Sequence, residues 1–298
     1  MIHAALVIIA AAVAAAPVQL APAEADSVIQ ALLKSREETR AWLREQPTSY
    51  LAAIKRVDFG NKALLTVGRS SDNDVRLDAP DIADHHLQVS IDEDKFHVEA
   101  LDAPARFKVD QAEVREATVG PSSIGVGRFL IRLSHQRFPA LIVFDPQSPG
   151  FKDYKGLTYF PPALAYRYVV KLAKNPRPDT VIILSTRGSR RRALRVGWFD
   201  FRVGKVACRL EADRLLEPGV GESDLSVFFQ DATSGKESYP VGRYVDPRKL
   251  ADGRYLLDFN DAYNPACAIS DHYNCPIPPR ANTLKVAIRA GEMDSHYH

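Results

Sequence analysis

Polar and charged residues gather in the C-terminal third of the chain, between apolar runs that have the length of strands. The set comprises Asp231, Thr233, Ser234, Lys236, Arg243, Asp258, Asn260, Tyr263 and Asn264. Polar residues at the ends of strands in a rigid sheet can converge on one pocket. We therefore treat these residues as candidates for binding a ligand.

One interpretation of the set is structural. Asp231 and Asp258 would form ion pairs with Lys236 and Arg243, and the two asparagines would cap turns. Such a buried polar network would fix the loops between the strands.

Two functional interpretations remain open beside it. In the first, the same groups bind a small or extended polar ligand, with Arg243 gripping an anionic group through two hydrogen bonds. In the second, Asp231 or Asp258 acts as a general acid–base beside Tyr263, in a hydrolase-like or isomerase-like enzyme that also uses Arg243. The sequence contains no G-x-S-x-G element, glycine-rich phosphate loop or H-E-x-x-H motif. We therefore assign no catalytic residue, expect no cofactor and favour a non-enzymatic module.

Two cysteines, Cys267 and Cys275, lie eight residues apart in a proline-rich segment. In an oxidising compartment a disulfide between them would staple this loop, with a contribution of about 2–3 kcal/mol. Free structural thiols are an alternative, as is a zinc site that adds His272 and either Asp271 or His296. Because the spacing fits no familiar zinc motif, the sequence favours the disulfide and predicts no metal.

The blocks that contain these residues resemble a known family. They are Phe228–Asp246, Leu257–Cys267, Cys275–Pro279 and Ala290–Glu292, preceded by Gly156–Pro161 and Tyr166–Arg167. Over residues 148–292 the chain closely resembles the family called domain of unknown function 1684. The resemblance implies no reaction.

A second resemblance covers about a quarter of the chain. Gly68, Arg69, Asn73, Asp74 and His86 match the pattern of forkhead-associated (FHA) domains, which are β-sandwiches that bind phosphothreonine through loop residues. The family's S-R-x-H element is altered, because Ala83 replaces its serine and Asp84 its arginine. Phosphate recognition needs donors and positive charge. The resemblance therefore implies the fold but not phosphopeptide binding, and His86 is expected to be structural.

Short alternating apolar runs predict strands throughout the chain after residue 64. They cover 64–67, 74–77, 86–91, 95–98, 106–109, 129–133, 140–144, 166–170, 181–184, 194–201, 205–210, 225–229, 255–259 and 284–288. No long amphipathic helix interrupts the second half, which argues against parallel βαβ units. We expect a mostly β protein: a helix at 26–47, an FHA-like β-sandwich at 50–145 and an antiparallel β domain at 150–292.

A basic cluster stands between two predicted strands. It consists of Arg187, Arg190, Arg191, Arg192 and Arg195, with glycine and serine among them. Five guanidinium groups could hold an anionic partner. No aromatic stripe is interleaved for stacking on bases, so we interpret the cluster as a solvated turn.

The first 25 residues have the features of an export signal. Ala4–Ala16 is an unbroken apolar run, and Ala23-Glu24-Ala25 is an A-x-A pattern after which Asp26 would begin the mature chain. The run is short for a membrane span, and it is preceded by His3 rather than by Lys or Arg. An uncleaved anchor or an ordinary N-terminal helix are the alternatives. We expect a periplasmic or secreted protein.

The composition limits the partners. The chain has 39 basic and 37 acidic side chains, and its formal net charge is +2. This balance gives no general attraction to nucleic acid or to an anionic membrane. We therefore expect a small or extended polar ligand, or a protein partner, and no membrane contact beyond the export signal.

Overall fold

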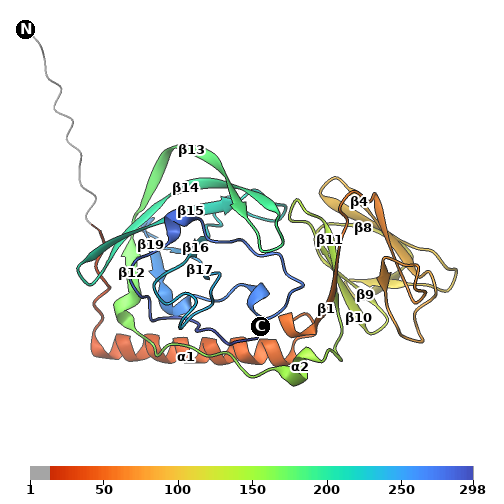
Figure 1. The fold of residues 1–298 in the computed structure, drawn as a ribbon, viewed down its shortest axis with the longest axis horizontal. Coiled ribbons are helices and arrows are strands. Elements are labelled where there is room, and N and C mark those ends of the chain that lie inside the picture. Colours follow the sequence, from red (N-terminus) through yellow and green to blue (C-terminus); the bar gives the residue numbers. More distant parts are fainter. Residues whose placement is uncertain (1–13, 298) are drawn as a thin grey trace, which may run out of the picture.

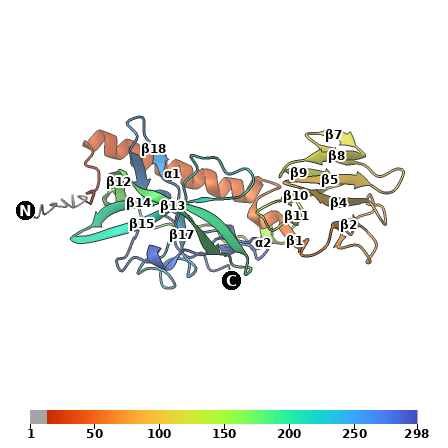
Figure 2. The ribbon, with the colours of Figure 1, turned by 90° about the horizontal axis from the view of Figure 1, so that it is seen from above.

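A computed structural model describes residues 14–297 of the chain. Residues 1–13, the larger part of the expected export signal, lie outside the described residues. Figure 1 shows an elongated molecule with an FHA-like sandwich at one end and the C-terminal domain at the other. The long helix α1 lies along the C-terminal domain (Figures 1 and 2).

Helix α1 spans Pro22–Glu45 and therefore begins four residues before the predicted start at 26. A proline suits the first turn because its missing N–H needs no partner there. Glu24 accepts a hydrogen bond of 3.1 Å from the N–H of Ala21, which closes the turn. The predicted boundary at residue 25 thus falls inside the helix. Among the described residues, no helix combines the length and the apolar character that a membrane crossing requires.

Residues 15–18 are joined to the C-terminal domain by isolated backbone bridges to β14 and β12. The N–H of Ala15 donates to Asp200 at 3.2 Å, its carbonyl accepts from Arg202 at 2.9 Å, and Val18 donates to Arg167 at 2.8 Å. Ala15 also packs on the apolar core of that domain. This segment is therefore part of the folded body.

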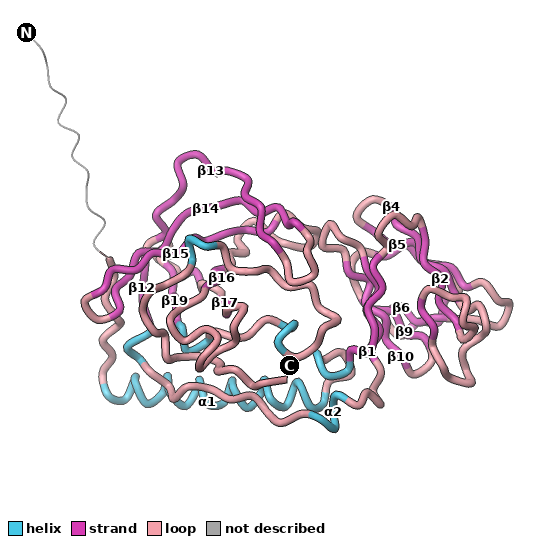
Figure 3. The backbone as a smooth tube through the Cα atoms, viewed as in Figure 1, coloured by secondary structure: helices cyan, strands magenta, loops and turns pink. Residues whose placement is uncertain are grey.

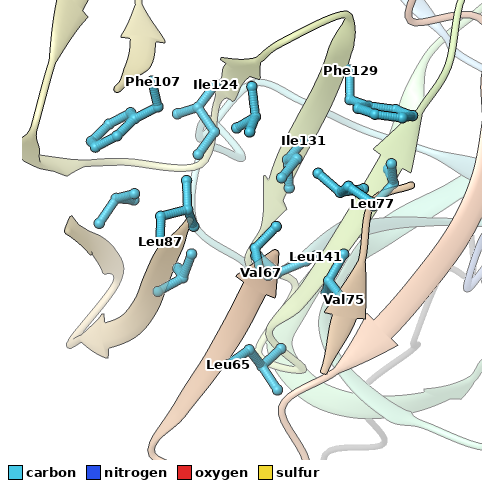
Figure 4. Packing of buried hydrophobic residues seen from close by; sticks show 14 of the residues in the cluster. Leu65, Val67, Val75, Leu77, Leu87, Phe107, Ile124, Phe129, Ile131 and Leu141 are labelled. Atoms are coloured by element: carbon cyan, nitrogen blue, oxygen red, sulfur yellow. The ribbon is translucent and has the colours of Figure 1, made fainter. Parts of the chain in front are cut away.

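The FHA-like domain is a sandwich of two sheets. The first has the order β1 (Ala53–Asp58), β11 (Ala140–Phe144), β10 (Phe129–Ser134), β9 (Ser123–Val126), β6 (Phe107–Val109) and β7 (Ala112–Val114). The second has the order β3 (Val75–Arg76), β2 (Leu64–Gly68), β4 (Leu87–Asp92), β5 (Lys95–Ala100) and β8 (Glu116–Val119). Alternate side chains of both sheets, such as Val67, Leu87 and Ile131, meet in a single core (Figure 4).

The C-terminal domain is built on antiparallel strands. Three long ones are β13 (Leu172–Leu184), β14 (Arg190–Val203) and β15 (Val206–Leu215). The shorter ones are β12 (Arg167–Val170), β16 (Val227–Phe229), β17 (Arg243–Val245), β18 (Arg248–Lys249) and β19 (Tyr255–Asp258). The remaining turns of helix are α2 (Gly150–Asp153), η1 (Tyr50–Ala52), η2 (Leu164–Tyr166), η3 (Phe259–Asp261), η4 (Ala266–Ala268) and η5 (Arg280–Asn282). Long loops fill the space enclosed by the sheets (Figure 3).

The mostly β architecture agrees with the sequence, but the last predicted strand is wrong. Residues 284–288 form no strand, although Leu284 and Ile288 are buried in the core. Ile288 donates its N–H to the carboxylate of Asp231 instead of to a neighbouring strand. Alternating apolar residues indicate that a segment is buried, and a buried segment need not pair with a neighbouring strand.

The junction of the two domains contains Arg191, which the sequence placed in a solvated turn. This residue is only 2% exposed. It donates to Ser185 at 2.7 Å, to both carboxylate oxygens of Glu217 at 2.7 and 2.9 Å, and to Gln136 of the FHA-like domain at 2.8 Å. The solvated-turn interpretation holds for the exposed members Arg187, Arg190 and Arg192. Arg195 is half-buried and pairs with Asp179 and Glu211.

Candidate functional site

A cleft of about 400 Å³ lies between α1 and the C-terminal domain. One face of the helix forms one wall, and loops at the ends of the C-terminal strands form the other. The lining residues are Leu32, Ser35, Arg36, Thr39, Trp42, Leu43, Tyr50, Leu157, Tyr159, Asn260, Asp261, Ala262, Tyr263, Asn264, Ile269 and Glu292. The lining therefore combines six apolar side chains and three tyrosines with seven polar or charged residues, and ligand pockets usually combine apolar walls with placed polar groups.

Two carboxyl groups line the cleft, Asp261 and Glu292. Asp261 is exposed, whereas Glu292 is only 6% exposed. Oε2 accepts a hydrogen bond of 2.8 Å from the N–H of Asn264, and Oε1 lies 3.3 Å from the hydroxyl of Tyr159. Burial raises the pKa of Glu292 to about 7, although the hydrogen bonds and the nearby Arg243 and Arg36 favour the ionised form. Near neutral pH this side chain is therefore present both as an acid and as a carboxylate.

The backbone at Glu292 is held by the glycine before it. Gly291 has φ +79°, a conformation that side-chain-bearing residues rarely adopt. A Cβ there would lie 2.4 Å from the carbonyl oxygen of Ala262. The tight turn places Glu292 at the wall of the cleft, where its N–H donates to that same carbonyl at 2.8 Å.

Two arginines fasten α1 over the cleft. Arg36 donates to the carbonyl of Phe160 at 2.9 Å, and Arg40 donates to that of Leu157 at 3.2 and 3.0 Å. Both guanidinium groups lie over the ring of Tyr159, at 4.7 and 5.0 Å from its centre. Burial lowers the pKa of Arg36, and its buried Nε makes no hydrogen bond within residues 14–297.

Three candidate residues from the sequence reach this cleft. Asn264 donates to the carbonyl of Met293 at 2.8 Å, while its buried Oδ1 accepts no hydrogen bond from the described chain. Tyr263 donates to Asp246 at 3.0 Å. The side chain of Asn260 has a structural role, because its amide hydrogen-bonds both the N–H and the carbonyl of Ala163, at 2.7 and 3.0 Å.

Another group of candidates forms a buried network away from the cleft. Arg243 and Asp231 have fully buried side chains and lie 3.4 Å apart. The hydroxyl of Thr233 donates to Asp231 at 2.7 Å, and Arg243 also donates to the carbonyls of Ile288 at 2.8 Å and Glu292 at 3.1 Å. Arg243 thus fixes the chain that leads to Glu292, which is a positioning role.

The expected pairing of the remaining candidates is different in the structure. Asp258 forms its ion pair with Arg167 rather than with Lys236 or Arg243. It also accepts from the backbone and the side chain of Asn260, at 3.0 and 2.8 Å. Lys236 is exposed.

The cysteines face each other as thiols and not as a disulfide. The sulfur of Cys275 accepts a hydrogen bond of 3.3 Å from the N–H of Cys267. A hydrogen bond from the thiol of Cys275, with help from Tyr239 and Thr186, lowers the pKa of Cys267 to about 7, and the same contact raises the pKa of Cys275. The zinc alternative with His272 is not assembled, since residues 14–297 contain no metal-binding group of three or more such side chains.

Internal hydrogen bonds hold the FHA-type loops in place. Asn73 bonds the carbonyls of Ser70 at 2.9 Å and Asp84 at 2.8 Å, and His86 links Ala83 to Arg106. The guanidinium of Arg69 donates to the carboxylate of Asp84 at 3.1 and 3.0 Å. The arginine that matches the family's loop pattern is therefore paired with an internal carboxylate.

Sequence reasoning missed Glu292, Arg36 and Tyr159 as site residues. Glu292 ends the Ala290–Glu292 block and Tyr159 lies in the Gly156–Pro161 block, so the blocks pointed to the right segments. Arg36 gave no signal, because an arginine on an amphipathic helix is usually solvated.

Comparisons with known proteins agree with both resemblances. Residues 152–293 match the family model described as "Protein of unknown function (DUF1684)", and residues 65–122 match that of the FHA domain. No curated protein matches the chain.

Three solved structures give the scale of similarity. An uncharacterized protein of Haloarcula marismortui is 35% identical, with 51% of this chain and 83% of that one covered and a TM-score of 0.40. The FHA domain of FhaA, in complex with the intracellular domain of another protein, is 18% identical, with 28% of this chain and 81% of that one covered and a TM-score of 0.22. EmbR of Mycobacterium tuberculosis, bound to a low-affinity phosphopeptide, is 14% identical, with 41% of this chain and 31% of that one covered and a TM-score of 0.22.

The two family matches fall on the two domains of the structure. The C-terminal half of the chain therefore belongs to the DUF1684 family of proteins of unknown function, and an FHA-like domain precedes it.

Proposed function

We propose that the chain is an exported, non-enzymatic binding protein that holds a small, mostly apolar molecule in the cleft between α1 and the C-terminal domain. The observation that supports this most is Glu292, a carboxyl group that is buried in an open cleft and has a pKa raised to about 7. Perturbed carboxyl groups in clefts are concentrated at functional sites.

The polar groups of the cleft favour an uncharged ligand that can both donate and accept. The protonated Glu292 offers a donor, and Oδ1 of Asn264 offers an acceptor that the described chain leaves unused. A carboxamide presents the complementary pair, a carbonyl and an N–H. Leu32, Leu43 and Leu157 would cover the apolar body of such a molecule.

Fluorescence of Trp42 can test this proposal, because its ring lies in the cleft wall, 5.1 Å from that of Tyr50. The chain has one other tryptophan, Trp198, and Trp198→Phe isolates the signal. Benzamide is the probe and benzoate the charged control of the same shape. We expect saturable quenching by benzamide and weaker binding of benzoate.

Matched variants decide whether Glu292 is responsible. Glu292→Gln keeps an N–H donor and should retain binding, whereas Glu292→Ala should lose about tenfold or more in affinity. Glu237→Gln is the control, because Glu237 pairs with Arg289 at the surface. Equal binding by the Glu292→Ala variant would contradict the proposal.

An acid–base enzyme is the second candidate, and the same carboxyl group favours it. A pKa near 7 suits proton transfer at neutral pH. The earlier set of Asp231, Arg243, Asp258 and Tyr263 is less suitable, because Asp231 and Arg243 bind each other in the interior. A turnover that disappears in the Glu292→Gln variant while binding persists would favour the enzyme.

We propose that the FHA-like domain binds a protein partner without phosphate. The support is the ion pair of Arg69 with Asp84, which neutralises the arginine of the phosphate loop. Phosphothreonine and plain threonine versions of one peptide should bind the wild-type chain equally weakly. A clear preference for the phosphorylated form would overturn this.

Export and the cysteine bridge are proposed together. The apolar run before Pro17 supports export, and the contact between Cys267 and Cys275 supports a bridge in an oxidising compartment. Mass spectrometry of protein recovered from the periplasm or medium should find the two thiols oxidised, two hydrogens lighter than after reduction. Recovery in the cytoplasm with both thiols alkylatable would contradict both statements.

A further inference from the structure

The first sheet of the FHA-like domain turns two arginines toward the C-terminal domain. Arg132 on β10 and Arg56 on β1 both pair with Ile142 on β11 in antiparallel register. Directly paired residues project from the same face of a sheet. The two guanidinium groups therefore flank Ile142 on one face, which bounds a cavity of about 280 Å³ between the domains.

The two arginines differ in how their charge is neutralised. Arg56 donates to the carboxylate of Asp58 at 2.9 and 2.7 Å. Arg132 has no carboxylate partner among residues 14–297, and its guanidinium lies 4.9 Å from the centre of the Phe144 ring. A partly buried guanidinium without a carboxylate partner at a cavity wall would be stabilised by a bound anion, because burying an unpaired charge is costly.

The neighbours of Arg132 add donors from several directions. The hydroxyl of Tyr273, across the cavity, is buried and donates its proton to no acceptor within the described chain. Burial raises the pKa of Tyr273, and the charge of Arg132 together with a hydrogen bond from its guanidinium acts in the opposite direction. Ser134 lies on the same face of β10 as Arg132, two residues along.

The nearby carboxylate of Glu217 does not neutralise Arg132, because it pairs with Arg191. Glu217 lines the adjoining cavity of about 600 Å³, which also contains Arg132. Both of its carboxylate oxygens accept from Arg191. The oxygen of the Gln136 amide also accepts from Arg191, so its NH₂ group is the part left to face a ligand.

We propose that this cavity binds a tetrahedral oxyanion, phosphate or sulfate, at Arg132, with Tyr273 and Ser134 as further donors. Several convergent donors around one guanidinium suit such an ion better than a planar carboxylate. Because Arg132 and Tyr273 belong to different domains, the anion would also stabilise their junction. This cavity shares Tyr50 and Tyr263 with the wall of the α1 cleft, but of the two only this one is lined by Arg132, Ser134 and Tyr273. The proposal does not depend on the function proposed for the cleft.

Thermal unfolding of the full chain tests the site, with inorganic phosphate or sulfate added at constant ionic strength in sodium chloride. Binding to the folded state should raise the melting temperature in a saturable manner. Arg132→Gln should weaken the apparent affinity by about tenfold or more, and Tyr273→Phe by less. The two titrations also show which of the two ions is preferred.

Arg76→Gln is the matched control, since Arg76 is an exposed arginine of the same domain that pairs with Asp78 and lies outside this cavity. It should keep the full response. Circular dichroism must show that the Arg132→Gln variant is folded, and Tyr273→Phe provides a second variant if it is not. An unchanged response in both variants, or no saturable response in the wild-type chain, would overturn the proposal.

Discussion

Oε1 of Glu292 lies 3.3 Å from the hydroxyl of Tyr159, although the two residues are 133 positions apart in the chain. Tyr159 in turn lies beneath Arg36 and Arg40 of α1. The contact therefore joins the last block of the C-terminal domain to the helix that covers the cleft. Burial at this meeting point gives Glu292 its raised pKa.

Ligand binding in the cleft should depend on pH through Glu292. The folded pKa of about 7 lies above the ordinary value of 4.5, so the side chain is an acid at pH 6 and largely a carboxylate at pH 8. Benzamide should bind more weakly as the pH rises through 7, because the donor to its carbonyl is lost. Titrations across this range check the result, and the Glu292→Gln variant should give a flat profile.

Asp213 should make the protein less stable at high pH. It is 1% exposed, neither carboxylate oxygen has a hydrogen-bond partner among residues 14–297, and burial, followed by the charge of Glu211, raises its pKa to about 7. The native chain then keeps a proton that the unfolded chain loses near pH 4. The free energy of unfolding therefore falls between about pH 4 and 7 and stays low above that.

The substitution Asp213→Asn should remove this decrease in the free energy of unfolding at high pH. Two other charged neighbours, Arg195 and Asp179, act on Asp213 in opposite directions. The gain at pH 8 should reach at most about 4 kcal/mol, because each pKa unit corresponds to about 1.4 kcal/mol. Urea unfolding at pH 5 and pH 8 measures it, and equal effects at both values would show that Asp213 does not titrate as stated.

Removing Arg191 should destabilise the junction between the domains. Arg191→Met leaves the buried carboxylate of Glu217 without its partner, and such breaks cost about 3–5 kcal/mol. The neighbouring Arg190→Met, at an exposed position, should change stability by less than about 0.5 kcal/mol. Chemical unfolding of both variants gives the comparison. Similar values would mean that Arg191 is not the residue holding the junction.

Residues 14–25 should contribute to stability. A chain that starts at Asp26 lacks the backbone hydrogen bonds of Ala15 and Val18 and the first turn of α1. It should melt at a lower temperature than a chain that starts at Ala14, since each hydrogen bond contributes about 1 kcal/mol. Equal melting temperatures would mean that this segment is dispensable for the stability of the fold.

The sequence by itself determined what depends on local pattern. The alternation of apolar residues predicted most strands of both domains, and the motifs around Gly68 and Phe228 indicated the two family resemblances. Glycine positions, helix breakers and apolar period act over a few residues, so one chain suffices to recognise them.

Only the tertiary structure decided which polar residues meet. It buried Arg191 against a residue of the other domain, paired Asp258 with Arg167, and brought Glu292 to Tyr159 beneath α1. Each of these outcomes joins residues that are far apart in the sequence. The pKa of an ionisable side chain or a thiol depends on its burial and on the partner that the fold supplies. Neither can be inferred from the neighbouring residues in the sequence.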